Sequence, residues 1–188
     1  MNKDELSFNT QDYIQCFFDI LDHMIQGMMD ARISCSLSST FINQMIPHHR
    51  GAIQMSKNLL QYTTDIPLQN IACRIISEQT KSIQDMLKIQ STCISYTNYQ
   101  QDINQYLQSF QEISQNMFHE MSHAEIDNNI NISFLHEMIP HHEGAVKMSK
   151  SILQYPICPE LIPILNAIIS SQEHGITEMK ALLQKYHQ

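Results

Sequence analysis

The chain has 188 residues, 43% of them hydrophobic, which is enough for one domain with a sizeable buried core. Its formal charge of -8 would repel nucleic acid and anionic lipid, and its 11 lysines and arginines form no run, so both partners are disfavoured. No apolar run reaches the ~18 residues that a membrane-spanning helix needs.

Sparse turn residues predict an all-α fold, because the chain has four glycines and many good helix formers. Six helical stretches are expected, at about 11–32, 39–62, 67–90, 104–126, 132–155 and 160–186. The connections that follow the second and fifth stretches are short, so each of these stretches forms an antiparallel hairpin with the next. Two such hairpins complete an antiparallel four-helix bundle, to which 11–32 and 104–126 are added helices.

The second and fifth stretches both have candidate N-cap residues at their start and a proline in their interior. Ser39 or Thr40, and Asn131 or Ser133, are the expected N-caps. Pro47 and Pro140 fall well inside these stretches, where proline removes a backbone donor and crowds the carbonyl four residues earlier. Each of these helices is therefore expected to kink.

The cysteines and the N-terminus indicate a location. Five cysteines are widely spaced without a CxxC pair, which favours free thiols in a reducing cytoplasm. The first 13 residues contain no signal-peptide core, so the chain as written is expected to be cytoplasmic, or exported if a leader was trimmed.

A repeated segment dominates the sequence. MIPHHRGAIQMSK at 45–57 returns as MIPHHEGAVKMSK at 138–150, and 14 of 22 positions are identical between 41–62 and 134–155 without a gap. The offset is 93 residues. We interpret the chain as a single all-helical domain, 1–188, with an internal duplication in which repeat 1 covers about 11–90 and repeat 2 about 104–187.

The repeat places potential metal ligands on one stripe of each helix. At 100° per residue, Met45, His48 and Met55 align, as do their counterparts Met138, His141 and Met148. His49 and His142 lie about 100° further round, within reach of a helix interface. Gly51 and Gly144 leave room for close approach.

Ten of the twelve methionines form pairs across the 93-residue offset. The pairs are Met24 with Met117, Met28 with Met121, Met45 with Met138, Met55 with Met148, and Met86 with Met179. Core packing explains any single pair, because methionine fills irregular gaps. Retention of all five beside paired histidines favours a common chemical role, since exchanges of Met for Leu or Ile usually cost less than ~1.5 kcal/mol.

Thioether and imidazole ligands together suit Cu(I), and by analogy Ag(I). A di-iron bundle needs glutamates on two helices and Glu-x-x-His on two others, and this pattern is not duplicated here. HEMIPH, at 136–141, resembles a zincin motif only superficially, because its histidines are five residues apart. No nucleophile motif or phosphate-binding loop is present, so we expect no catalytic residues.

Several polar residues are weaker candidates. Gln79 and Gln172 lie seven residues before Met86 and Met179, on the same face, and are expected to orient an imidazole through a hydrogen bond. His119 and His123 are four apart and could chelate, although a solvated helix face is favoured. Three further histidines without a counterpart are expected at the surface, His23, His174 and His187, and His136 precedes one of the two motifs only.

MIPHHxGAxxMS, followed by IISEQTKSIQDM or IISSQEHGITEM, resembles the bacterial ferritin-like family of unknown function numbered 305, over about 39–187. The resemblance implies a ferritin-like four-helix bundle with an internal pseudo-two-fold, and copper binding or resistance as in some members. Members often carry a carboxylate where this chain has Ser82 and Gly175.

These observations predict a non-enzymatic protein that buffers or sequesters Cu(I), with Ag(I) as a second candidate ion, and with no protein partner identified. The main predicted ligands are Met45, His48, His49, Met55, Met86, Met138, His141, His142, Met148 and Met179, and the second-tier ligands are Met24, Met28, Met117 and Met121. Two alternatives stay open. One is a ferritin-like redox metalloprotein with iron or manganese, and the other is a helical interaction domain without metal.

Overall fold

The computed structural model describes residues 6–187, and this part of the chain is helical without strands, as predicted. The helices are α1 (Phe8–Met29), α2 (Leu37–Leu59), α3 (Ile66–Cys93), α4 (Gln100–Ser122), α5 (Ile130–Ile152) and α6 (Leu161–Tyr186). Each matches a predicted stretch to within a few residues. No helix in the described range is long and apolar enough to cross a membrane.

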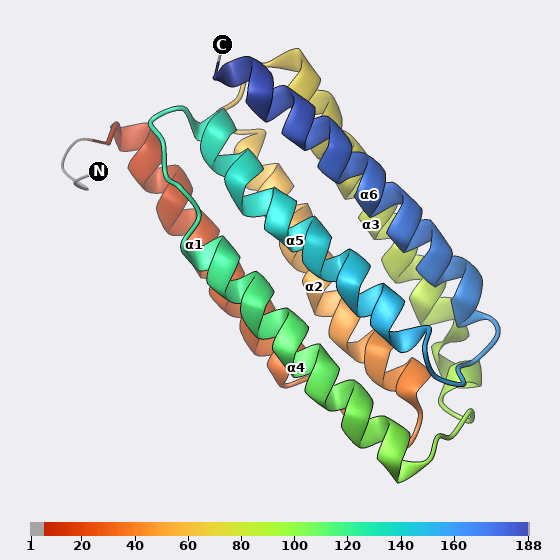
Figure 1. Cartoon of the computed structure of the whole chain (residues 1–188). Helices are drawn as coiled ribbons and strands as arrows, with labels where there is room; N and C mark the ends of the chain where they lie inside the picture. The colour runs from red at the N-terminus through yellow and green to blue at the C-terminus, as the bar shows by residue number, and fades with distance from the viewer. Residues whose placement is uncertain (1–5, 188) are drawn as a thin grey trace.

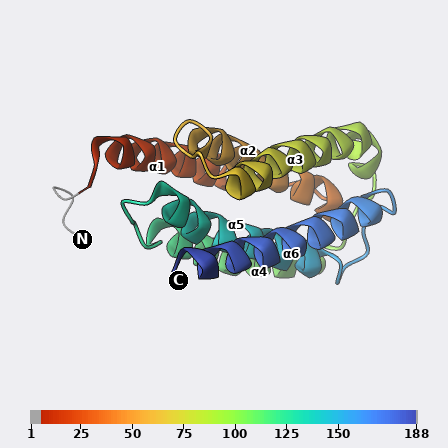
Figure 2. The ribbon, with the colours of Figure 1, turned by 90° about the horizontal axis from the view of Figure 1, so that it is seen from above.

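The helices form two layers that follow the two halves of the sequence. Figure 2 shows α1, α2 and α3 side by side in one layer and α4, α5 and α6 in the other. Across the layers, α2 contacts α5 and α3 contacts α6, while α1 packs on α2 and α4 on α5 (Figure 1). The helices α2, α3, α5 and α6 thus form the predicted four-helix bundle, and α1 and α4 are the added helices.

The helix caps differ from the predicted ones. Ser36 caps α2 by accepting a hydrogen bond from the backbone N–H of Ser39, and Asn129 caps α5. Both helices begin two or more residues earlier than predicted because the serine or asparagine just before the first turn satisfies its free N–H groups. Both helices continue through Pro47 and Pro140.

Two buried tyrosines tie the layers together at equivalent places. Tyr13 of α1 donates to Glu137 Oε2 of α5 at 2.5 Å, and Tyr106 of α4 donates to Gln44 Oε1 of α2 at 2.8 Å. The 93-residue offset relates both partners of one pair to those of the other. The hydrogen bonds therefore join each outer helix to the central helix of the opposite layer.

Replacing Glu137 by Gln, the residue at the equivalent position, is expected to stabilise the protein at neutral pH. Burial raises the pKa of Glu137 well above its usual value, and the hydrogen bond from Tyr13 opposes the shift. A carboxyl with a raised pKa stabilises the fold below its unfolded value of ~4.3, and this contribution is lost as the pH rises towards the folded pKa. The free energy of unfolding of Glu137→Gln should exceed that of the wild type by on the order of 1 kcal/mol at pH 8.

Urea denaturation of both proteins between pH 5.5 and pH 8 checks this expectation. The difference should shrink as the pH falls towards the unfolded pKa of ~4.3, because less free energy is then needed to keep the carboxyl of Glu137 protonated in the folded protein. A constant difference across this range would contradict the assignment of the effect to ionisation of Glu137.

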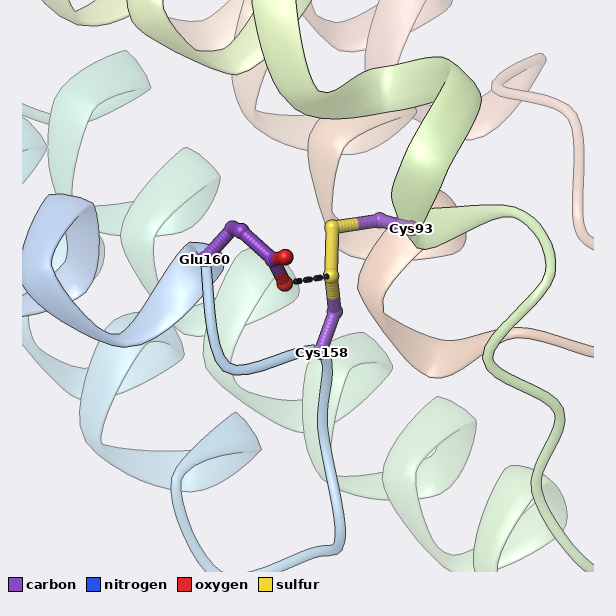
Figure 3. A group of neighbouring side chains, drawn as sticks. All are labelled: Cys93, Cys158 and Glu160. Carbon is purple, nitrogen blue, oxygen red and sulfur yellow. Dashed lines mark hydrogen bonds between the residues drawn. A yellow bond between two sulfur atoms is a disulfide. The ribbon is translucent and has the colours of Figure 1, made fainter.

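One cysteine pair corrects the prediction of free thiols. Cys93, at the end of α3, forms a disulfide with Cys158, in the connection between α5 and α6 (Figure 3). Glu160 Oε2 lies 3.1 Å from Cys158 Sγ. Cys16, Cys35 and Cys73 are free, as predicted. The sequence could not reveal the pair because its members are 65 residues apart and share no motif.

Candidate metal centre

The repeated segments occupy the centre of the molecule. Because α2 and α5 are each covered by helices on two sides and by each other, even their small and polar residues are buried. All fourteen predicted ligands lie in this core or on the faces that cover it, and none is more than 3% exposed. The stripe predicted from helical periodicity is therefore a core stripe.

The four histidines form a row across the α2–α5 contact. The ring centroids of His48 and His141 are 3.8 Å apart, with the planes inclined by 33°. His49 extends the row from His48 at 5.8 Å, and His142 extends it from His141 at 5.8 Å. The row thus draws equally on both repeats.

Several ring nitrogens in this row lack a hydrogen-bond partner. Nδ1 of His48, His49 and His141 is buried without a partner among the described residues. His141 Nε2 lies 3.2 Å from the backbone carbonyl of His48, which can only accept, so Nε2 carries the proton and Nδ1 presents its lone pair. Buried polar atoms normally find partners, because an unsatisfied one costs about 1–3 kcal/mol. A ligand for these nitrogens would remove that cost.

The imidazoles are neutral at physiological pH. Burial lowers the pKa of His49 to about 3 and that of His141 to about 4, and also places the pKa of His48 and His142 well below the ordinary value. The neighbouring imidazoles lower the pKa of three of them further. Since a metal binds the neutral ring, the site needs no deprotonation before it can coordinate.

The paired methionines come from all three helix pairs and are buried in the same core. Met45 and Met55 belong to α2, Met86 belongs to α3, and their counterparts occupy α5 and α6. Met24 and Met117 project from α1 and α4 onto Gly51 and Gly144. A Cβ at Gly51 would lie 2.5 Å from Met24 Sδ and 3.1 Å from Met24 Cβ, so the glycine is what allows this close approach.

Replacing Gly51 by Ala is expected to destabilise the protein through Met24. The new methyl group would displace the whole methionine side chain, and overpacking of this kind costs ~1–3 kcal/mol, partly offset by the better helix propensity of alanine. In a Met24→Ala background the same substitution should cost nothing. Urea denaturation of the four proteins gives the coupling energy, and additive effects would show that the contact does not limit this position.

The glutamines do not orient the histidines as expected. Both amide atoms of Gln79 and Oε1 of Gln172 are buried without partners among the described residues. Instead, Ser82 Oγ lies 3.1 Å from His49 Nε2, and His142 packs on Gly175, where a Cβ would lie 3.1 Å from its ring. Ser82 and Gly175, which occupy equivalent positions in the two repeats, thus each contact the second histidine of a pair.

The remaining histidines lie outside the row. His119 and His123 stack at 4.2 Å between ring centroids but are exposed at the end of α4. His136 lies near Glu125 and His187, and His174 Nε2 lies 3.2 Å from Glu178 Oε2. A separate group of metal-ligand types, Cys93, Cys158 and Glu160, has ligand atoms within 4.8 Å of one another, but its sulfurs are bonded to each other.

Together, the fold and the site define an all-helical protein with a buried histidine–methionine cluster between two similar three-helix layers. The profile of the family described as "Domain of unknown function (DUF305)" matches residues 23–90 and 38–183, and the chain belongs to this family. The predicted resemblance to family 305 is thus confirmed. Its ferritin-like relationship stays a prediction.

The chain is also similar to solved structures. CopM in an Ag-bound form obtained by soaking is 26% identical, with a TM-score of 0.60 over 80% of this chain and 97% of CopM. CopM in the Cu(II)-bound form is 26% identical, with a TM-score of 0.57 over 79% and 97%. A DUF305 fragment from Deinococcus radiodurans is 20% identical, with a TM-score of 0.56 over 79% and 95%, and shares the fold. No curated protein matches.

Proposed function

We propose that this protein binds Cu(I), and also Ag(I), in the cluster between α2 and α5, and that it buffers or sequesters the metal without catalysing a reaction. The observation that carries the proposal is the row of four buried neutral imidazoles, in which Nδ1 of His48, His49 and His141 has no partner among the described residues. The similar protein CopM has been solved with silver and with Cu(II), which supports a metal of this kind.

The donors around the row fit a soft monovalent ion. Thioether sulfur binds Cu(I) and Ag(I) well and carries no proton, while imidazole suits copper in general. Met45 and Met138 lie one helical turn before the first histidine of each pair, on the same stripe, and are fully buried. Met86 and Met179 come from the facing helices. We assign the ligands to these residues and keep Met24, Met28, Met117 and Met121 as second-tier ligands.

The alternatives receive less support from the site. Iron or manganese in a helical bundle requires several buried carboxylates. Among the described residues Glu137 is the buried acidic side chain, it receives a hydrogen bond from Tyr13, and the residue at the equivalent position of the other repeat is Gln44 rather than a carboxylate. A role in packing alone would leave the Nδ1 atoms unsatisfied, at a cost of about 1–3 kcal/mol each.

Competition with a coloured Cu(I) chelator under anaerobic conditions tests the proposal. Ascorbate, rather than a thiol, keeps copper reduced so that the Cys93–Cys158 disulfide stays intact. The wild type should withdraw Cu(I) from the chelator, and His48→Ala/His141→Ala should weaken binding by roughly 10–100-fold or more, because two ligands are lost. Met45→Leu/Met138→Leu, which conserves volume, should also weaken it.

The matched control is His119→Ala/His123→Ala, which removes two histidines from an exposed helix face and should leave Cu(I) affinity unchanged. Absence of competition by the wild type would refute the proposal. Stoichiometric iron in protein purified without a histidine tag would favour the redox alternative.

A further inference from the structure

A pocket of about 330 Å³ opens between α3 and α6. Its inner wall includes His49, together with Gln79 and Gln172, and Ser82 contributes the hydroxyl that contacts His49. Ala167, at the mouth, is exposed, whereas His49 is fully buried. The inner wall of the pocket thus lies against one end of the row of imidazoles.

The row continues from this pocket into the core. His49 is 5.8 Å from His48, and His48 is 3.8 Å from His141, measured between ring centroids. His49 Nδ1 and the amide oxygens of Gln79 and Gln172 are buried without partners among the described residues. Polar atoms without partners therefore belong to residues at the inner wall of the pocket, where the row begins.

The equivalent place at the other end of α3 and α6 is built differently. A groove there is lined by Asn70, Ile71, Arg74 and Glu178, which the 93-residue offset relates to Pro163, Ile164, Ala167 and Asp85 of the pocket. Arg74 and Glu178 form an ion pair between the two helices. His142, the counterpart of His49, is not in its lining and packs on Gly175 instead.

We propose that the α3–α6 pocket is the entrance by which the metal ion reaches the cluster, and that His49 is the first ligand it meets. This proposal rests on the proposed function and adds the route. The two halves of the protein are thus not equivalent: the small Ala167 leaves one entrance open, and Arg74, paired with Glu178, covers the matching position at the other end.

The net charge of the whole chain, rather than that of the mouth, suits a cation. At the mouth Glu78 and Asp85 contribute carboxylates, but Asp85 is paired with both Lys81 and Lys88. The whole chain carries a formal charge of -8. Such a field raises the encounter rate of a positive ion with the opening.

The test transfers the arginine of the covered end to the open end. In Ala167→Arg the new side chain faces Asp85, as Arg74 faces Glu178, and lies across the mouth of the pocket. Ala167→Trp obstructs the same place without charge. Ala181→Arg is the matched control, because Ala181 is also exposed on α6, about 21 Å along the helix from Ala167.

The measurement is the rate at which Cu(I) leaves its coloured bicinchoninate complex for the protein in stopped flow, with the final occupancy read from the same trace. Ala167→Arg and Ala167→Trp should load about tenfold more slowly or worse and reach the wild-type occupancy, while Ala181→Arg should load at the wild-type rate. Wild-type rates in both Ala167 variants would overturn the entrance while leaving the proposed function intact. Failure of the wild type to take up Cu(I) at equilibrium would instead overturn the proposed function.

Discussion

Without metal, the protein is expected to lose stability steeply as the pH falls from about 6.5 towards 4, because four imidazoles are buried in the neutral state. The folded pKa is about 3 for His49 and about 4 for His141, and it is also well below normal for His48 and His142. In the unfolded chain each imidazole has a pKa of ~6.5. The unfolded chain therefore binds protons that the folded protein does not.

The direction and size of this loss of stability follow from the difference in proton binding between the folded and unfolded states. Stability rises with pH wherever the unfolded state binds more protons, so the contribution of these histidines is complete above pH ~6.5 and is lost as the pH falls towards the folded values. Each imidazole contributes up to about 1.4 kcal/mol per pH unit within this window. Four of them together contribute up to about 11 kcal/mol over two pH units, which is comparable to the whole stability of a domain, about 5–15 kcal/mol.

Urea denaturation of the metal-free protein at pH 7.5, 6.5 and 5.5 measures this slope. His48→Leu/His141→Leu removes two of the four titrating rings and should reduce the slope by about half over the same range. His119→Gln/His123→Gln changes two exposed histidines and should retain the wild-type slope. Equal slopes in all three proteins would show that the buried row does not govern acid sensitivity.

This burial alters the pH dependence that the ligand types alone suggest. From the sequence, imidazole ligation fades below an ordinary pKa of ~6.5 while thioether ligation persists. In the folded protein, however, burial delays protonation of the rings to lower pH. We therefore expect acid to release the metal mainly because the protein unfolds. Bound metal should shift this unfolding to a lower pH than that of the metal-free protein.

Periodicity and pairing predict much of this molecule. The sparse glycines and the 3.6-residue pattern predict six helices, and the repeated stripe with Met45, His48 and Met55 predicts a core-facing surface, because helical spacing alone sets which side chains share a face. Adjacent hairpins follow from short connections. These features depend on the geometry of short segments, which can be predicted from a single sequence.

Contacts between distant segments are less predictable. The 3.8 Å approach of His48 to His141 depends on how α2 crosses α5, and the hydrogen bond from Tyr13 to Glu137 depends on how α1 lies against the opposite layer. The sequence shows that Glu137 and Gln44 occupy equivalent positions in the two repeats. No motif indicates that each of them accepts a hydrogen bond from a tyrosine. The disulfide was missed for the same reason: two cysteines without a common motif became neighbours only when the end of α3 met the α5–α6 connection.

Besides the buried neutral imidazoles, the disulfide is expected to contribute strongly to the free energy of unfolding. Cys93 and Cys158 are both buried, and their bond joins the end of α3 to the α5–α6 connection across 65 residues of chain. Closing a loop of this length restricts the unfolded chain by an amount that corresponds to about 4 kcal/mol. Cys93→Ser/Cys158→Ser should therefore lower the free energy of unfolding by roughly 2–5 kcal/mol, as should reduction of the wild type.

The free cysteines provide the matched control. Cys16→Ser/Cys35→Ser/Cys73→Ser keeps the disulfide and should retain both the wild-type stability and its sensitivity to a dithiol reductant. Urea denaturation with and without reductant should show that the reductant affects the wild type and this triple variant but not Cys93→Ser/Cys158→Ser. If the reductant shifts no midpoint, the bond does not stabilise the fold. Because such bonds persist in oxidising compartments, the protein would lose this stabilisation in the reducing cytoplasm that the sequence predicts.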